Sequence, residues 1–266
     1  MAAFALLGRL RAVGRQNLQL AFPGIAPVER DRVLRAEFRQ LGRQLAEFAL
    51  MSRYRRETIS ATIHYDGLEN FECARSQGKG VLVLTGHLGA WELSSFFHSL
   101  MGSPMGMVIR RLDNPLIDRY VNHVRCLHGN RVLPKDEFAR GLIAEMRAGR
   151  TVGILMDTNM TPPQGTFVPF FGVAACTGSG LARIARKTGA AVLPGFLLEQ
   201  PGGRYRLHFG QALPVDDTGN SERDAVSNTA RFTSVLEHYI RQYPEQWLWM
   251  HRRWKTRPPG EPRIYP

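Results

Sequence analysis

The sequence contains only three cysteines, and their spacing matches no common metal or redox motif. Cys73, Cys126 and Cys176 form no C-x-x-C pair and lack the spacing of zinc ligands. This pattern favours a reducing compartment, with Cys126 and Cys176 as small core residues.

The sequence also lacks the short motifs of several large enzyme classes. No G-x-S-x-G nucleophile elbow is present, which disfavours an α/β-hydrolase, and "TGSG" at 177–180 resembles that motif only superficially. No P-loop occurs, and no G-x-G-x-x-G follows a strand. The H-E-x-x-H zinc motif is missing as well. We therefore expect neither a metal nor another cofactor.

Long apolar runs are missing at the N-terminus. The apolar stretch in "MAAFALLGRL" is interrupted by Arg9 and is too short to span a bilayer. A charged leader and a cleavage site are absent, which disfavours a signal peptide. Because Arg9, Arg11 and Arg15 accompany the apolar stretch, we expect this arm to lie against a membrane surface.

Acidic residues are scarce relative to basic ones. The chain has 35 Lys and Arg against 23 Asp and Glu, a net charge of +12. Such an excess favours a polyanionic partner, which includes nucleic acid, an anionic membrane and an acidic protein, although a merely solvated basic surface is the alternative. No RNA- or DNA-binding motif is present and the basic residues are spread along the chain, so nucleic acid is disfavoured.

The hydrophobic pattern predicts an α/β protein. Pro27 opens an amphipathic helix that reaches about Tyr54, and buried strands then alternate with helices, which indicates a mostly parallel sheet covered on both faces. "PGGR" at 201–204 predicts a hairpin, so the sheet ends mixed. We expect one domain, 1–266, with a helical arm (1–54) and an α/β core (59–266). Strands are expected at 59–65, 80–85, 105–110, 131–134, 151–157, 190–199 and 205–210, helices at 91–101, 114–129, 137–149, 178–189 and 222–243, and a long loop at 158–176.

A histidine follows the strand at 80–85, in "VLVLTGHLGAWE". His87 lies where ligands bind in open α/β sheets, and flanking glycines allow a tight turn that brings Glu92 against its ring. An imidazole oriented by a carboxylate is equipped as a general base. A satisfied histidine beside a helix-start acid is an equally good interpretation of this spacing alone. A second H-x4-E, at His64 and Glu69, has its histidine inside a strand.

Further charged residues follow other strands. Arg110 and Arg111 end one strand and Asp157 ends another, and the helix at 114–129 carries Arg125. A basic pair at this edge suits a phosphate or an oxyanion. The alternatives are a surface role for Arg125 and a turn acid at Asp157. Since no nucleophile accompanies the base, we expect the substrate to supply one, as a hydroxyl.

Several longer segments resemble the bacterial lipid A biosynthesis acyltransferases, which are lauroyl and myristoyl transferases of the lysophospholipid acyltransferase-like superfamily. The resemblance runs from "RQNLQLAFPG" at 15–24 to "HRRWKTRP" at 251–258 and is carried by "TGHLGAWE", "RRLDNPLIDRYV", "PKDEFARGLIAEMRAGRTVGILMD", "VPFFG" and "MHRRWKTRP". It implies a glycerolipid-acyltransferase-like fold.

The resemblance also implies a reaction. The donor is an acyl thioester on acyl carrier protein, an acidic partner, and the acceptor is a hydroxyl on a phosphorylated glucosamine lipid. His87 takes the hydroxyl proton and Glu92 orients the His87 ring. Arg125 and Asp157 match positions that matter for activity, and we expect them, with Arg110, to bind the substrate. Neither a metal nor a covalent enzyme intermediate is required.

The start of the chain departs from the family pattern. Family members usually begin with a hydrophobic anchor helix, and this sequence begins almost where that helix ends. We expect a protein on the cytoplasmic face of the inner membrane, peripheral or with a missing anchor. A related enzyme that acylates another glycolipid or a phospholipid is the alternative within this superfamily.

Overall fold

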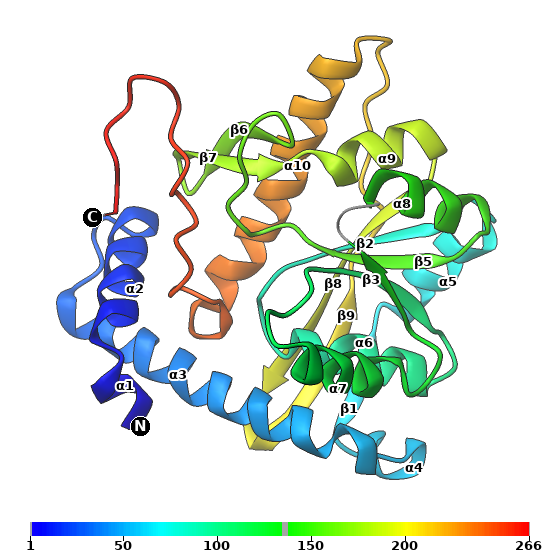
Figure 1. Ribbon diagram of the computed structural model, residues 1–266, viewed down its shortest axis with the longest axis horizontal. Coiled ribbons are helices and arrows are strands. Elements are labelled where there is room, and N and C mark those ends of the chain that lie inside the picture. The colour runs from blue at the N-terminus through cyan, green and yellow to red at the C-terminus, as the bar shows by residue number, and fades with distance from the viewer. Residues whose placement is uncertain (1, 135–137, 266) are drawn as a thin grey trace. The chain divides into compact units, whose positions relative to one another are not determined.

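A computed structural model of the protein describes residues 2–134 and 138–265 (Figure 1). Its contacts divide the chain into two compact units, each built from separate stretches of sequence. Unit 1 comprises Met1–Arg43, Met156–Ala182 and Asp216–Pro266, and unit 2 comprises Gln44–Leu155 and Arg183–Val215. That the chain folds as one domain stays a prediction.

The described strands of unit 2 form a seven-stranded mixed sheet. Its order is β1-β9-β8-β2-β5-β3-β4, and every neighbouring pair is parallel except the antiparallel pair β8–β9. Gly202 and Gly203, both with positive φ, make the turn between these two strands, so the predicted hairpin and mixed α/β sheet are confirmed. The strands are β1 (Ile63–Asp66), β2 (Val81–Thr85), β3 (Met105–Ile109), β4 (Arg131–Pro134), β5 (Thr151–Leu155), β8 (Ala191–Gln200) and β9 (Arg204–Phe209).

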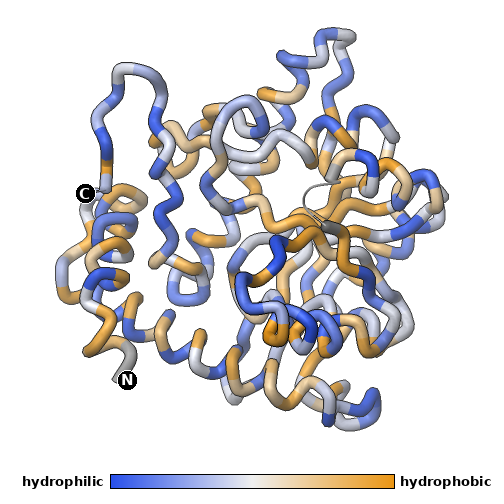
Figure 2. The backbone as a smooth tube through the Cα atoms, viewed as in Figure 1, coloured by the Kyte–Doolittle hydropathy of each residue, from blue (hydrophilic) through white to orange (hydrophobic). Residues whose placement is uncertain are grey.

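Helices cover this sheet because its central strands, such as β2, are apolar on both faces. Val81, Leu82, Val83 and Leu84 of β2 are all buried, and Figure 2 shows the sheet as mainly hydrophobic. One core cluster joins β2, β8 and β9 to helices α5 and α6. Helix α8 packs on β4 and β5. The helices of this unit include α4 (Arg56–Ile59), α5 (Leu68–Ser76), α6 (Trp91–Leu100), α7 (Pro115–Cys126) and α8 (Phe138–Arg147).

The segment before the sheet differs from its prediction. The strand expected at 59–65 starts only at Ile63, because residues Arg56–Ile59 form α4. The Thr58 hydroxyl accepts a hydrogen bond from the Arg55 backbone and donates one to the Arg55 carbonyl, which favours this helical turn. Helix α5 was not predicted. Gly67, with φ 74°, provides the left-handed turn that leads into it.

Unit 1 contains a hairpin where the sequence predicted a loop. Strands β6 (Gly165–Phe170) and β7 (Val173–Gly178) pair antiparallel within the segment 158–176 and just beyond it. The loop prediction was therefore wrong for most of this segment. Phe171 (φ 52°) and Gly172 (φ 76°) make the turn, and Pro169 lies exposed on its strand opposite Ala174. Helix α10 (Ser221–Gln242) packs on β6.

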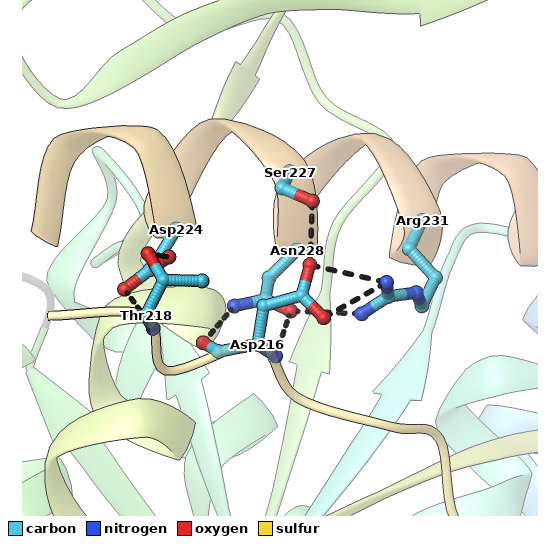
Figure 3. A network of polar contacts seen from close by, with 6 residues as sticks. All are labelled: Asp216, Thr218, Asp224, Ser227, Asn228 and Arg231. Carbon is cyan, nitrogen blue, oxygen red and sulfur yellow. Dashed lines mark hydrogen bonds and ion pairs between the residues drawn. The ribbon is translucent and has the colours of Figure 1, made fainter. Parts of the chain in front are cut away.

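Polar side chains fix the start of α10 to the segment before it. Figure 3 shows this network around Asp216, whose carboxylate accepts hydrogen bonds from Ser227 at 2.6 Å and Arg231 at 3.0 Å. The hydrogen bond from Ser227, and then that from Arg231, lower the pKa of Asp216. Asn228 is buried and bonds the Asp216 backbone in both directions. These contacts satisfy the polar groups of Asp216 and hold the segment before α10 against the helix.

The N-terminal arm is helical, as predicted, and consists of α1 (Ala2–Leu6), α2 (Gly8–Ala21) and α3 (Pro27–Leu50), followed by a 3-10 turn (Met51–Arg53). Phe4 is buried edge-to-face against Phe38, with ring centroids 5.4 Å apart. Leu6 is 81% exposed, and Leu7 and Leu10 are exposed as well. Some apolar residues of the arm are therefore buried within unit 1, and others are exposed to solvent. No described helix is both long and apolar enough to cross a membrane.

The C-terminal segment of unit 1 is a core element despite its basic sequence. Trp247, Trp249 and Trp254 are fully buried, and so is Arg253. The Arg253 guanidinium donates to the Cys176 carbonyl at 3.0 Å and to the Thr177 hydroxyl. Burial lowers the pKa of Arg253 to about 10, although the negative charge of Asp157 opposes this shift. The "HRRWKTRP" motif thus places a charge in the interior rather than on the surface.

A buried histidine makes the stability of unit 2 depend on pH. His98 of α6 is 1% exposed, with Nδ1 2.8 Å from the Tyr65 hydroxyl and its ring against Phe71. Burial lowers the pKa of His98 to about 4. In the unfolded chain the imidazole binds a proton near pH 6.5, so stability is complete above that pH and is lost as pH falls towards 4.

We therefore expect the free energy of unfolding to fall by up to about 3 kcal/mol through this group between pH 7 and pH 4. His98→Gln should remove that component, leaving a shallower pH dependence than wild type in urea titrations. The exposed histidine of β1 offers a matched control, since His64→Gln should leave the slope unchanged. Identical slopes for wild type and His98→Gln would contradict this account.

Candidate active site

The turn from β2 into α6 places His87 at the carboxyl end of the sheet. Gly89 has φ 68°, and a Cβ there would lie 2.0 Å from the Leu197 carbonyl oxygen, so a side chain has no room. The next residue, Ala90, donates its backbone N–H to that same oxygen at 2.8 Å. The turn is therefore fixed against β8, and the tight turn predicted from the sequence is confirmed at Gly89.

His87 lies in this turn and is half-buried. Its ring meets the indole of Trp91 edge-to-face, with centroids 5.1 Å apart. This position leaves the imidazole partly accessible to a ligand. His64 is instead an exposed residue inside β1, as predicted.

Glu92 forms a bidentate ion pair with Arg125, a contact that the sequence did not predict. Nε of Arg125 donates to Glu92 Oε2 at 2.8 Å and Nη2 donates to Oε1. Their side chains are only 15% and 25% exposed. Burial by itself lowers the pKa of Arg125, but the hydrogen bond and charge of Glu92 outweigh it and raise that pKa. The pair is held in place by α6 and α7, and the predicted contact of Glu92 with the His87 ring stays a prediction.

A pocket of about 80 Å³ lies beside this ion pair. Its polar and aromatic part is formed by Trp91, Glu92, Arg125 and the hydroxyl residues Thr85, Ser94 and Ser95, and the strands supply apolar side chains and two glycines. The apolar part includes Val83 of β2, Met105, Met107 and Ile109 of β3, Gly153 of β5 and Gly195 of β8. A charged pair next to an apolar cavity suits a substrate with a reactive polar end and a hydrocarbon tail.

The two arginines after β3 lie at the predicted edge but point to solvent. Strands β2, β5 and β3 are parallel neighbours, so their carboxyl ends share one edge. Arg110 and Arg111 follow β3 there, both exposed, and Arg110 forms an ion pair with Asp113 at 3.2 Å. That pair is 80% and 94% exposed, so it adds little to stability.

Asp157 belongs to unit 1, although it closely follows β5 in the chain. It is 2% exposed, and the indole N–H of Trp247 donates to its Oδ2 at 2.9 Å. Its charge also acts on the buried Arg253. A role for Asp157 towards the substrate stays a prediction, since these contacts describe a buried network within unit 1.

The structure also bears on metal binding. Among residues 2–134 and 138–265, no three His, Cys, Asp or Glu side chains gather as ligands for an ion. The sequence expectation that the reaction needs no metal stays a prediction, which a chelator test of activity checks.

Comparison with known proteins assigns these features to a family. Residues 1–256 match the family model of the bacterial lipid A biosynthesis acyltransferases. The chain belongs to this family. It is therefore an acyltransferase that acts in the biosynthesis of lipid A, which is the lipid part of lipopolysaccharide.

Named relatives support the assignment over most of their length. The chain is 30% identical to the lipid A biosynthesis lauroyltransferase of Escherichia coli (strain K12) over 265 residues, 99% of this chain and 85% of the relative. It is 29% identical to the palmitoleoyltransferase of the same organism, covering 97% and 83%. It is 27% identical to the myristoyltransferase of that organism, covering 97% and 80%. The resemblance in the sequence motifs is thus confirmed.

Proposed function

We propose that this acyltransferase moves a fatty acyl chain from acyl carrier protein to a hydroxyl of a lipid A precursor, with His87 as general base. The observation that carries the proposal is the Glu92–Arg125 pair beside an apolar pocket at the strand end where His87 lies. Together with the family assignment, this arrangement supports a reaction between a thioester and a hydroxyl.

In the proposed reaction His87 acts first as base and then as acid. The imidazole accepts the proton of the acceptor hydroxyl as its oxygen forms a bond to the thioester carbonyl carbon. The tetrahedral intermediate then breaks its carbon–sulfur bond, and the departing thiolate takes the proton from the imidazolium. A thioester has a good leaving group, so the hydroxyl itself serves as nucleophile and no acyl-enzyme is needed.

Glu92 and Arg125 assist this step by orienting the His87 ring. We assign Glu92 to fix the tautomer of His87 and to stabilise the imidazolium. Arg125 holds the Glu92 carboxylate through two hydrogen bonds, one of 2.8 Å. Such a bidentate contact restricts rotation more than a single bond does. For Arg110, Arg125 and Asp157 we keep the proposed role in substrate binding.

Charge supports the proposed donor, and the lipid acceptor supports the proposed location. Acyl carrier protein is acidic, and the net charge of +12 favours its recruitment. The acceptor is a membrane lipid, so we place the enzyme at the cytoplasmic face of the inner membrane. The arm contributes through Leu6, Leu7 and Leu10, which are exposed. Arg15 contributes less charge than its sequence suggested, because it pairs with Asp31 at 2.6 Å.

The pocket near Glu92 is proposed to receive the acyl chain, and Gly153 lines it without a side chain. A Cβ at Gly153 would lie 2.9 Å from Cε of Met105, the flexible end of that side chain. Gly153→Ala should therefore fold normally and narrow the pocket. We expect the variant to prefer shorter acyl donors than wild type does. The ratio of rates with short and long donors should change by about fourfold for each methylene that the pocket no longer holds. Competition between donors of different length measures the ratio, and an unchanged ratio would place the acyl chain elsewhere. Gly141→Ala is the control, since a Cβ at Gly141 meets no atom within 4 Å.

One assay tests the proposed function as a whole. Purified protein is incubated with acyl carrier proteins that bear several chain lengths and with a lipid A precursor, and the products are read by mass spectrometry. The proposal expects one acyl ester to be added to the precursor, with acyl carrier protein preferred over acyl-coenzyme A. Acylation of a different glycolipid or a phospholipid, but not of the precursor, would assign the enzyme to another acceptor.

A further inference from the structure

Helix α7 and its two ends expose a group of large apolar side chains. Leu116 is 66% exposed, Ile117 54% and Tyr120 56%. Leu112 before the helix and Leu127 at its end are 43% and 37% exposed. We call these five residues the α7 surface. Single exposed apolar residues are ordinary on a protein, whereas a contiguous group marks an interaction site.

The helical repeat places three of these residues together. Leu116, Tyr120 and Leu127 are separated by four and seven residues, which puts them on one side of the helix. Arg125 lies on the opposite side, where it holds Glu92. The same helix thus presents an apolar face to solvent and a charged residue to the candidate active site.

Charged residues frame this apolar face. Arg111 and Arg119 are exposed, and neither forms an ion pair with a described residue. Arg110 pairs with Asp113. The carboxylate of Asp118 accepts hydrogen bonds from the Leu112 backbone at 2.8 Å and from Asn122 at 3.1 Å. His123 is exposed on the same side of the helix as Leu116.

We propose that the α7 surface docks into the interface of an anionic bilayer, with α7 lying in the membrane plane. Apolar side chains with arginines beside them and a tyrosine among them match the composition of helices that lie in such interfaces. A bilayer is favoured over an acidic protein, because Leu116, Ile117 and Tyr120 expose more than half of their surface, and a lipid interface buries such apolar area while Arg111 and Arg119 contact its anionic headgroups. The inference rests on exposure and charge rather than on the proposed reaction. Its consequence for that reaction is that Arg125 and Glu92 lie one helix thickness from the lipid.

Vesicle flotation tests the proposal with the full chain. Wild-type protein should float with vesicles of phosphatidylglycerol and phosphatidylcholine more than with phosphatidylcholine alone. Leu116→Gln/Ile117→Gln/Tyr120→Gln should lower the partition coefficient by about 10- to 100-fold. Arg111→Gln/Arg119→Gln should lower it only on anionic vesicles, and salt should weaken wild-type binding.

Two control variants separate this surface from other exposed apolar residues. Val28 is 78% exposed and Val226 43% exposed, so Val28→Gln/Val226→Gln should float like wild type. Leu6→Gln/Leu7→Gln/Leu10→Gln reports the contribution of the arm. Equal flotation of wild type and the α7 triple variant would overturn the proposal, and loss in the arm variant alone would assign docking to the arm.

A fluorescent reporter variant tests docking even if the α7 triple variant fails to fold. Tyr120→Trp places an indole on the α7 surface, and lipids brominated on their acyl chains should quench it, whereas Val226→Trp should not be quenched beyond wild type. Absence of extra quenching at position 120 would contradict docking.

Two further measurements distinguish a membrane from a protein partner, and loss of docking from loss of the reaction. If the α7 triple variant loses affinity for acyl carrier protein in solution but still floats, the surface belongs to that protein and the proposal is wrong. Activity on a detergent-dispersed acceptor should survive in this variant, so loss of docking and failure of the proposed reaction are distinguishable.

Discussion

Replacing His87 with alanine is expected to lower kcat by on the order of 10²–10⁴ while leaving the fold intact. His87 lies in a turn and is half-buried, so its removal leaves no large cavity. The loss follows from removing the group that accepts the hydroxyl proton. Initial rates with saturating donor and acceptor measure it, and thermal unfolding confirms that the protein remains folded.

His64→Ala is the matched control for this experiment, because His64 shares the H-x4-E spacing but is exposed within β1. It should retain nearly full activity. Equal losses in the two variants, or near-normal activity of His87→Ala, would show that the base is another residue.

Replacing Arg253 with methionine is expected to lower the free energy of unfolding by about 3–5 kcal/mol. Arg253 is 1% exposed, and its guanidinium satisfies the Cys176 carbonyl and the Thr177 hydroxyl. Methionine fills part of the space but leaves those groups and the charge of Asp157 without their cation. Urea titration of the purified variant measures the change.

Lys255 is exposed in the same motif, so Lys255→Met should change the free energy of unfolding by less than about 0.5 kcal/mol. A similar small change for Arg253→Met would mean that the buried cation does not stabilise unit 1.

The sheet could be predicted because its central strands are continuous apolar runs with helices between them. The run 81–84 in β2 is entirely buried, and this kind of strand carries its signal locally. The β6–β7 hairpin was missed because prolines and a Phe-Gly turn obscured its alternation. Its strands are defined by pairing with each other and by packing against α10, neither of which is visible in a short window.

The position of His87 could be predicted from the strand end, but the partner of Glu92 could not. Glu92 and Arg125 are 33 residues apart, on α6 and α7, and only the packing of these helices brings them together. The burial of Arg253 was missed for the same reason, since a run such as "HRRWKTR" looks like surface. Residues that act through tertiary contacts carry no local signal in a single sequence.

A single-turnover experiment tests the central claim most directly. Enzyme in excess is mixed with isotopically labelled acyl donor and a lipid A precursor, the reaction is quenched at short times, and lipid and intact protein are weighed by mass spectrometry. The account predicts that the labelled acyl chain appears on the lipid as a new ester while no labelled protein accumulates. A labelled protein that forms without acceptor and then passes its label to added lipid would contradict direct transfer, and a lipid that never gains the label would contradict the proposed reaction itself.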